Sequence, residues 1–510
     1  MENQNKRLIK NTLMLYFRMF FIMFVGLYIS RVVLKELGAI DFGLYNVVGG
    51  VVTLFAFVQT ALGNATWRYI NVSLGKNDSS ETQEIFSYSI FLHLILCILV
   101  LVLAESIGLW FFYNKLNIPV HRLSVSFYVY QLSIITVLLT IIMAPYQSLI
   151  TAHEKMNAFA FISILEVIAK LLLAFSLIFV NVDKLLLYAI FLAVLQFIVN
   201  TIYFIYCRRN FKESSLVYKY NATKIKEMAT FAFYTVIPGL GFAASGQGIN
   251  ILLNIFWGPT VNAARGISIQ VQSLVVKFVQ SFQIAVNPQI TQEYIGNNRE
   301  RLEELVGETS KFSFYLVLIM SIPIINNMDY LLSLWLCQVP DFTSQFCVFT
   351  LIYSMFDVLA YPFLVGAAAN GNIRSYYTIN GIILISSVPL AYLALRYGFN
   401  PLSVYYIQLA LFIILLFFRV YYGAKLIDYP LRNILAKILK PVILVALFGY
   451  MFSFIIHNFV VQKDCTLLMV LLDSIASVLV IISVVYFIGL SKKERKVVEK
   501  VFINKMRRIC

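Results

Sequence analysis

The chain has 510 residues, of which 60% are hydrophobic and 13% charged, and its mean hydropathy is +0.81. A soluble globular domain carries about 25% charged residues, so this composition excludes an ordinary water-soluble fold. The formal net charge of +15 would suggest nucleic acid in a soluble protein. Here the basic residues flank apolar segments, which is the pattern that orients membrane proteins, and we expect no nucleic-acid partner.

Apolar blocks of about 20 residues recur along the whole chain. A bilayer core about 30 Å thick needs a helix of roughly 20 apolar residues to cross it, and in lipid each such block must be helical. The first block is too long for a signal peptide and lacks a small-residue cleavage site, so we expect a retained helix. The pattern predicts an all-α polytopic membrane protein with about fourteen spans: 11–33, 43–66, 85–110, 123–148, 158–180, 184–206, 229–256, 261–288, 310–336, 344–369, 376–396, 402–422, 441–461 and 466–490.

Basic residues are concentrated on one set of alternate loops. They gather at the N-terminus, in the loop after the sixth span, after the twelfth span and in the tail, with Lys311 and Arg419 counted among these loop residues. Basic loops stay in the cytoplasm, so both termini are expected there. The outer loops are short, which leaves no room for a folded domain outside the membrane.

Three basic residues that are not assigned to either set of loops fall inside predicted spans, where a charge costs roughly 2.5–3.5 kcal/mol and normally faces a cavity or a partner. Arg18 lies two turns inside the first span, from which it either lines a cavity or snorkels to the cytoplasmic edge. Lys170 stands four residues after Glu166, so the two can form an intramembrane ion pair. Lys277 lies near the middle of the eighth span, too deep to reach either interface, and we expect it to line a cavity. Arg265, nearer the outer end of that span, extends this basic lining.

Two spans carry polar side chains on one helical face. Gly50 and Gly266 belong to these stripes, and we expect the polar residues to line a lumen: Asn46, Thr53, Thr60 and Asn64 in the second span, and Gln270, Ser273 and Gln280 beside Lys277 in the eighth. An offset of about 220 residues superimposes the two stripes and places Gly38 on Gly258.

A second match has nearly the same offset, because the fourth span ends around Pro145 and the tenth around Pro362. The two matches predict a duplicated six-span unit, and such repeats are typical of alternating-access transporters. The predicted domains are an N-terminal six-helix lobe (1–206), a basic cytoplasmic linker (207–228), a C-terminal six-helix lobe (229–422), two additional helices (423–490) and a basic cytoplasmic tail (491–510).

The seventh span contains the best candidate for a hinge. Pro238 removes a backbone hydrogen bond, and Gly239 and Gly241 loosen the helix around it. Close packing of helices through small residues is the alternative explanation, and both can hold. The Gln247–Asn250 region adds polar groups next to this segment.

Three other ionisable residues lie inside spans. Asp357, in the repeat, is a candidate to bind a coupling proton or Na⁺. Asp473, in the last span, is expected to serve packing, and His93 to be a hydrogen-bonded core residue. The six cysteines show no zinc spacing, and Cys337 and Cys347 are expected to be isolated apolar cysteines rather than a disulfide pair. We expect no metal, no cofactor and, without a nucleotide-binding loop or hydrolase motif, no enzymatic activity.

The opening third resembles bacterial polysaccharide-biosynthesis transporters. The residues that carry the resemblance are the run 11–70, above all LGAIDFGLYN from Leu37 to Asn46, and PYQSLITAHEKM from Pro145 to Met156. These are Wzx-type O-antigen or capsule repeat-unit flippases of the MOP (multidrug/oligosaccharidyl-lipid/polysaccharide) exporter superfamily, which is MATE-like. The resemblance covers essentially the whole length.

The resemblance implies two six-helix lobes around a central cavity, with two additional helices, in the bacterial inner membrane. It also implies alternating-access flipping of an undecaprenyl-pyrophosphate-linked oligosaccharide to the outer leaflet, for O-antigen, lipopolysaccharide, capsule or exopolysaccharide synthesis. Membrane lipid, an H⁺ or Na⁺ coupling ion and polysaccharide polymerase or ligase enzymes are the expected partners. Cationic lumen residues commonly hold the pyrophosphate in this superfamily, and Arg18, Arg265 and Lys277 are the positions assigned to that role.

Three alternatives remain at this point. A peptidoglycan-precursor (lipid II) flippase would share the fold and the anionic lipid substrate. A drug or organic-cation antiporter of the same superfamily would need an acidic cavity, whereas the charges inside these spans are mostly basic. A membrane glycosyltransferase or polymerase would need a long outer loop, and the predicted outer loops are short.

Overall fold

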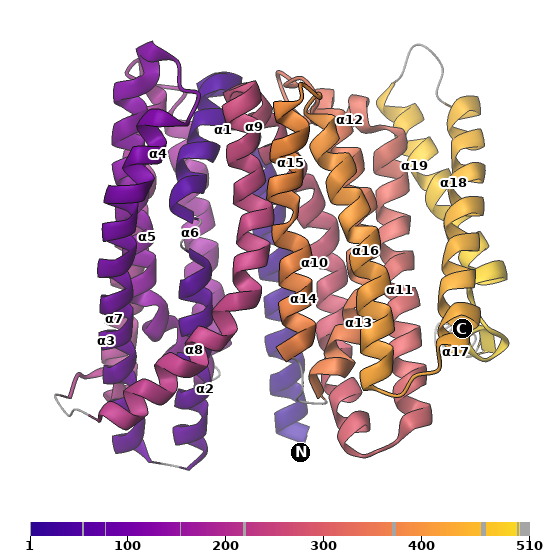
Figure 1. Ribbon diagram of the computed structural model, residues 1–510, viewed down its shortest axis with the longest axis horizontal. Helices are drawn as coiled ribbons and strands as arrows, with labels where there is room; N and C mark the ends of the chain where they lie inside the picture. Colours follow the sequence, from indigo (N-terminus) through magenta and orange to yellow (C-terminus); the bar gives the residue numbers. More distant parts are fainter. Residues whose placement is uncertain are drawn as a thin grey trace. The chain divides into compact units, whose positions relative to one another are not determined.

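The computed structural model describes residues 2–53, 56–76, 78–153, 155–217, 221–369, 374–460, 466–496 and 499, and in parts of its helices, such as 2–20 and 51–58, it describes the backbone without the side chains. Every element in these ranges is helical (Figure 1). The chain forms two compact units, and each is described separately.

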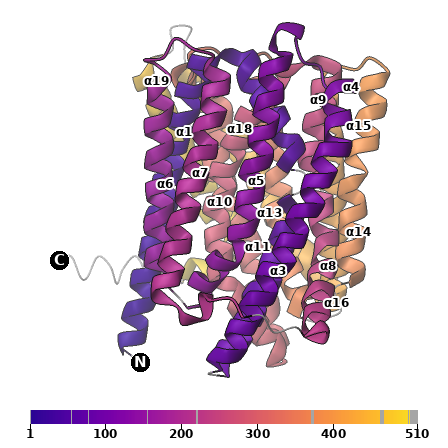
Figure 2. The same ribbon diagram turned by 90° about the vertical axis from the view of Figure 1, so that its left-hand side faces the viewer.

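The first unit comprises residues 1–266, 336–342 and 381–404. Its α-helices are α1 (Glu2–Thr53), α2 (Ala56–Gly75), α3 (Ser79–Leu103), α4 (Leu109–Asn114), α5 (Leu123–Ala152), α6 (Met156–Ser176), α7 (Lys184–Asn210), α8 (Ala222–Ala243), α9 (Ile249–Trp257), the start of α10 (Pro259–Ile295) and α15 (Ser387–Arg396). Two π-helical turns, η1 (Ala104–Gly108) and η4 (Ala244–Gly248), and two short 3₁₀ turns, η2 (Val120–Arg122) and η3 (Lys212–Ser214), link them. Figure 2 shows the packed helices α3, α5, α7 and α6 of this unit.

The second unit comprises residues 267–335, 343–380 and 405–510. It contains the rest of α10, then α11 (Arg299–Asn326), α12 (Met328–Trp335), α13 (Thr343–Ala369), most of α14 (Arg374–Ile385) and of α16 (Leu402–Leu426), α17 (Leu431–Ile434), α18 (Lys440–Val460) and α19 (Leu467–Val484). The π-helical turns η5 (Leu435–Leu439) and η6 (Val485–Gly489) adjoin α18 and α19, which pack on each other and on α11.

Ten helical stretches within the described residues are long and apolar enough to cross a bilayer. They correspond to ten of the fourteen predicted spans, from 85–110, 123–148, 158–180 and 184–206 through 310–336 to 466–490. The remaining four ranges fall on α1, α2, α8, α9 and α10, and all of these except α9 include residues that are not fully described. The prediction of an all-α polytopic membrane protein is therefore confirmed. The predicted linker 207–228 falls inside the first unit, and the division into six-helix lobes stays a prediction.

Polar caps define where several helices begin. The carboxylates of Asp78 and Asp183 accept the amide hydrogens of Glu81 and Leu186 at 2.9 and 3.1 Å. Thr466 caps α19 in the same way. Each cap satisfies an amide that lacks a partner in the first turn, so the helices begin at the short polar segments between apolar blocks.

Gly38 bends α1 without ending it. Its backbone angles are φ 78° and ψ 169°, in a region that is essentially restricted to glycine. Gly258, between α9 and α10, has φ 81° and ψ −176°. The repeat predicted from the sequence aligns these two glycines with each other. The two prolines of its second match, Pro145 in α5 and Pro362 in α13, both lie inside helices.

Candidate functional site

An ion-pair network surrounds the Gly38 bend of the first unit. Arg122 in η2 pairs with Asp41, just beyond the bend, and with Asp183, the cap of α7, at 2.5 Å. Lys184 pairs with Glu36, just before the bend, at 2.6 Å. We call these five residues the bend network. It ties two segments that are far apart in the sequence, η2 and the start of α7, to the bend in α1.

A cluster of asparagines joins α1, α9 and α10 beyond the bend. The side chain of Asn262 donates to the backbone and side-chain oxygens of Asn250 at 2.6 and 2.8 Å, and Asn250 donates to the Asn46 carbonyl at 3.2 Å. Asn250 and Asn262 are buried, and Asn46 donates to its own helix at the Phe42 carbonyl. The predicted lumen residue Asn46 thus sits beside a buried hydrogen-bonded junction of helices.

Arg265 belongs to this same junction. Its guanidinium is buried and donates to the Gly246 carbonyl at 3.0 Å, inside the π-helical turn η4. A π-helical turn displaces backbone carbonyls from the regular helical pattern, and such turns are frequent at functional sites. The cation predicted to extend a basic lining is therefore embedded in the first unit.

Lys277 stands on the accessible side of α10. Its side chain is exposed, as is that of Gln280, while Gln270 and Ser273 are half-buried and Ser273 donates back to the Gln270 carbonyl at 2.9 Å. The opposite side of the helix carries the buried residues Val271, Val275 and Val279. The predicted polar stripe is thus the unpacked face of a helix whose other face is core.

A charged cluster in the second unit joins α13, α14 and α16. Arg419 is 4% exposed and donates to Asp357 at 2.5 Å and to the side-chain oxygen of Asn380 at 2.7 Å. The Asp357 side chain is 35% exposed. The predicted coupling carboxylate therefore remains accessible while it holds a buried guanidinium, and we call these three residues the Arg419 cluster.

Counting Arg419 and Lys311 among cytoplasmic loop residues was wrong. Arg419 lies inside α16, and Lys311 lies inside α11, where it is 5% exposed and pairs with Glu494 at 2.6 Å. Both are paired within helices because a buried charge without a partner is too costly. A single charge changes the average hydropathy of a long apolar segment very little, so the hydropathy pattern does not show where these two residues lie.

Several other predicted residues have definite positions. Lys170 donates to Glu166 at 2.6 Å, which is the intramembrane pair expected from their spacing. Asn64 is exposed on α2. The side chains of Arg18, Thr53 and Thr60 lie outside the described residues, so their predicted roles stay predictions. Cys337 and Cys347 are both free thiols, which agrees with the expectation of isolated cysteines.

The predicted hinge lies within a continuous helix. α8 runs through Pro238 and Gly239, where the structure describes the backbone alone, and the departure from α-helical geometry begins at Ala244. A Cβ atom on Gly241 would lie 2.9 Å from the Cα atom of Gly381. Close packing through a small residue therefore accounts for Gly241, as the alternative explanation proposed.

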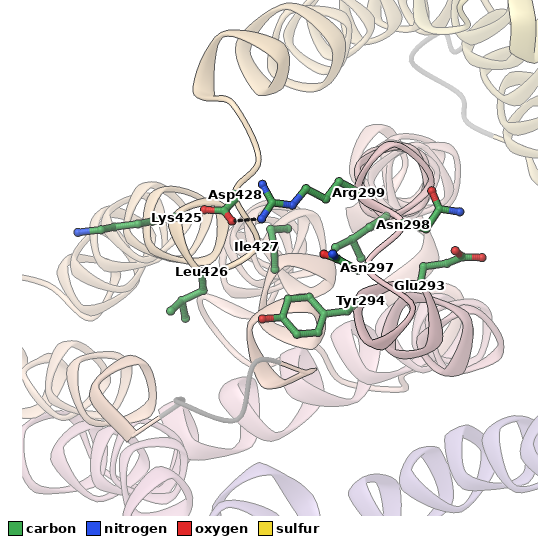
Figure 3. Close-up of a pocket in the computed structure, with 10 residues that line it drawn as sticks. Glu293, Tyr294, Asn297, Asn298, Arg299, Lys425, Leu426, Ile427 and Asp428 are labelled. Atoms are coloured by element: carbon green, nitrogen blue, oxygen red, sulfur yellow. Dashed lines mark ion pairs between the residues drawn. The ribbon is translucent and has the colours of Figure 1, made fainter.

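A polar pocket of about 510 Å³ lies at the end of the second unit, between α10, α11 and the segment after α16. Figure 3 shows Arg299 reaching from the start of α11 to Asp428, with Tyr294 below them. This pair spans 3.0 Å, but both side chains are more than half exposed, so it contributes little energy. The pocket is separate from the buried clusters of the helices.

The family of the chain follows from comparison with known proteins. The family model described as "Polysaccharide biosynthesis protein" matches residues 8–292, more than half of the chain. The chain belongs to this family. The polysaccharide biosynthesis family was the one indicated by the Leu37–Asn46 run, and that prediction is confirmed. Among curated protein sequences, none matches the chain.

The fold of this family member is that of MOP superfamily transporters. A lipid II flippase MurJ in an inward closed conformation superimposes with a TM-score of 0.65 at 14% identity, covering 92% of this chain and 98% of that one. An inward-facing multidrug resistance MATE transporter gives 0.62 at 15% identity, covering 80% and 95%. A MOP superfamily transporter from Pyrococcus furiosus gives 0.57 at 16% identity, covering 82% and 96%. At these identities the likeness concerns the fold.

Proposed function

We propose that this protein flips a lipid-linked oligosaccharide, carried on a polyprenyl pyrophosphate, from the inner to the outer leaflet of the bacterial inner membrane by alternating access. Three facts support the proposal: membership of the polysaccharide biosynthesis family, the fold shared with a lipid II flippase, and cations kept inside helices. An O-antigen, capsule or exopolysaccharide repeat unit fits the family description. In this proposal the protein acts as a transporter and carries out no catalytic step. Its two termini lie in the cytoplasm.

The Arg419 cluster is the observation that carries this proposal. A buried guanidinium presents paired donors that match phosphate oxygens, and its attraction to an anion is strengthened where water is excluded. Arg419 is held by a carboxylate that is itself partly accessible. A pyrophosphate entering the transport path can replace Asp357 as the partner of Arg419. The phosphate-binding roles predicted for Arg18, Arg265 and Lys277 stay predictions.

This arrangement also gives Asp357 its role in coupling. A proton or Na⁺ on Asp357 weakens its hold on Arg419, which leaves the guanidinium with Asn380 and free to take the substrate phosphate. When the substrate leaves, Arg419 returns to the carboxylate and the cation is released. In this scheme Asp357→Asn uncouples flipping from the gradient, because the amide can no longer exchange a cation.

Complementation of a strain that lacks its repeat-unit flippase tests the proposal, scored by surface polysaccharide. We expect wild type to restore it, Arg419→Ala to reduce it at least tenfold, and Arg419→Lys to restore it partly because lysine keeps the charge without the paired donors. Arg209→Ala, at an exposed position on α7, is the matched control. Full activity of a well-expressed Arg419→Ala variant would contradict the proposed role of Arg419.

Two further assays separate the alternatives. Rescue of a lipid II flippase depletion without rescue of surface polysaccharide would reassign the substrate to the peptidoglycan precursor. Ethidium efflux in a sensitised strain would favour a multidrug antiporter. The buried cations argue against a cavity for cations, so we expect no efflux.

A further inference from the structure

A buried carboxylate lies where α11, α18 and α19 meet. Asp473 of α19 is fully buried, and its Oδ2 accepts a hydrogen bond from Asn327 Nδ2 at 2.6 Å. His457 of α18 places Nδ1 at 3.1 Å from the same oxygen. Its other oxygen, Oδ1, is buried and has no hydrogen-bond partner among the described residues. The prediction that Asp473 serves packing leaves these polar contacts unexplained.

The surroundings of this carboxylate are polar but contain few charges. Asn326 donates to Ser453 at 2.9 Å, and Ser453 donates to Ser477 at 2.7 Å, one helical turn away from His457 and Asp473. Of the residues described on the elements packed against α19, α18 contributes His457 as the titratable group facing Asp473, and α11 with its C-cap contributes the uncharged Asn327. The charge of Asp473 must therefore be balanced locally.

A lone ionised carboxylate at this position is strongly disfavoured, because a buried charge needs a partner or a proton. Among the described residues, His457 is the side chain in contact with Asp473 that can carry a positive charge. Its side chain is 20% exposed, which connects the buried carboxylate to the surface of the unit. One proton neutralises the pair, either on His457 as an ion pair or on the Asp473 carboxyl group. Oδ1 is the open position for the proton on the carboxyl group.

We propose that Asp473 and His457 form a proton-binding site in the two C-terminal helices, distinct from the Arg419 cluster. A proton from water passes by way of His457 and binds Asp473 Oδ1, forming an O–H bond. A second proton then binds His457, beside the neutral Asp473 carboxyl group. The net charge of the pair rises from zero to plus one. Because Asp473 holds α19 to α11 through Asn327 and to α18 through His457, proton occupancy changes the attachment of α19.

Infrared difference spectroscopy of the purified full chain at two pH values tests this site. We expect a buried protonated-carboxyl band in wild type that corresponds to one proton per chain and is absent from Asp473→Asn, which keeps the size of the side chain and its contact with Asn327. Asp357→Asn is the matched control and should leave this band unchanged. Identical difference spectra for wild type and a folded Asp473→Asn protein would overturn the proposal.

A second measurement keeps the test valid if Asp473→Asn does not fold. The chain has four histidines, so ¹⁵N-histidine spectra identify His457 by its absence from His457→Gln. We expect the His457 signal to change with pH and to be insensitive to Na⁺ at constant pH. A signal that responds to Na⁺ and not to pH would overturn the proposal and identify a sodium site instead.

Discussion

Gly38 and Gly258 share one backbone conformation, with φ of 78° and 81° and ψ of 169° and −176°. They lie 220 residues apart: Gly38 lies inside α1, before the part that carries the start of one polar stripe, and Gly258 precedes α10, which carries the other. Two positions that need glycine for the same reason support the internal repeat more strongly than the few sequence identities do. What these two positions of the predicted repeat share is an unusual backbone conformation, which a comparison of side chains does not detect.

Replacing either glycine should destabilise the protein because a Cβ atom is disfavoured in this conformation. We expect Gly38→Ala and Gly258→Ala each to cost about 1–3 kcal/mol. Space is not the cause, since a Cβ on Gly38 would meet nothing within 4 Å. Gly26→Ala, in the helical part of α1 and equally open, is the control and should be neutral or stabilising. Thermal unfolding in detergent measures the difference, and equal stability of Gly38→Ala and Gly26→Ala would contradict the argument.

Hydropathy predicted the helices well, because the length of an apolar block is fixed by the bilayer. It failed for Lys311 and Arg419, since one charge barely changes the average of a long window. Their partners Glu494 and Asp357 are far away in the sequence, so no local pattern joins the pairs. The ion pair between Glu166 and Lys170, in contrast, could be predicted from their spacing, because residues four apart lie on the same face of one helix.

The bend network should give the protein a measurable dependence on acid. Burial tends to raise the pKa of Asp183, but hydrogen bonds from Arg122 and from the Leu186 amide, with the charge of Arg122, lower it below its ordinary value of 3.8. Its contribution is therefore present at neutral pH and is lost as the pH falls through the lowered pKa. Asp183→Asn keeps a cap for α7 but removes the charge, and we expect it to cost about 1 kcal/mol at pH 7.

The pH profile of unfolding checks this expectation. The stability difference between wild type and Asp183→Asn should shrink as the pH falls below the ordinary value of 3.8. Arg209→Ala, which replaces an exposed arginine on α7, serves as the control and should follow wild type at every pH. A difference that stays constant down to acid pH would show that Asp183 acts by shape and not by charge.

The buried pair Lys311–Glu494 should hold the end of the membrane region to α11. Both side chains are 7% exposed, and Glu494 also accepts the Ser491 amide at 2.6 Å while Ser491 accepts the Glu494 amide, a capping box. Lys311→Met leaves a buried carboxylate unpaired, so we expect a loss of about 3–5 kcal/mol. The double variant Lys311→Met with Glu494→Gln should recover most of it, because no buried charge then remains.

Thermal unfolding of these variants has a natural control in the same segment. Lys493 pairs with Glu304 at 3.0 Å, but its side chain is 84% exposed, so Lys493→Ala should change nothing measurable. Burial tends to raise the pKa of Glu494, yet the hydrogen bond and charge of Lys311 and the Ser491 cap lower it below 4.5. Wild type should therefore lose this contribution as the pH falls through the lowered pKa, and the double variant should not.

Gly43 lies where α1 closely approaches the start of α10. A Cβ atom there would lie 1.8 Å from the backbone carbonyl oxygen of Pro259, an atom that cannot move aside without displacing the helix. Gly43→Ala should therefore force the junction beside Asn262 apart and cost about 1–3 kcal/mol or more. Gly49→Ala, two turns later in α1 with nothing within 4 Å, should be tolerated. Unfolding midpoints and flippase complementation of the two variants test this, because equal behaviour would mean that α1 and α10 do not need their close approach.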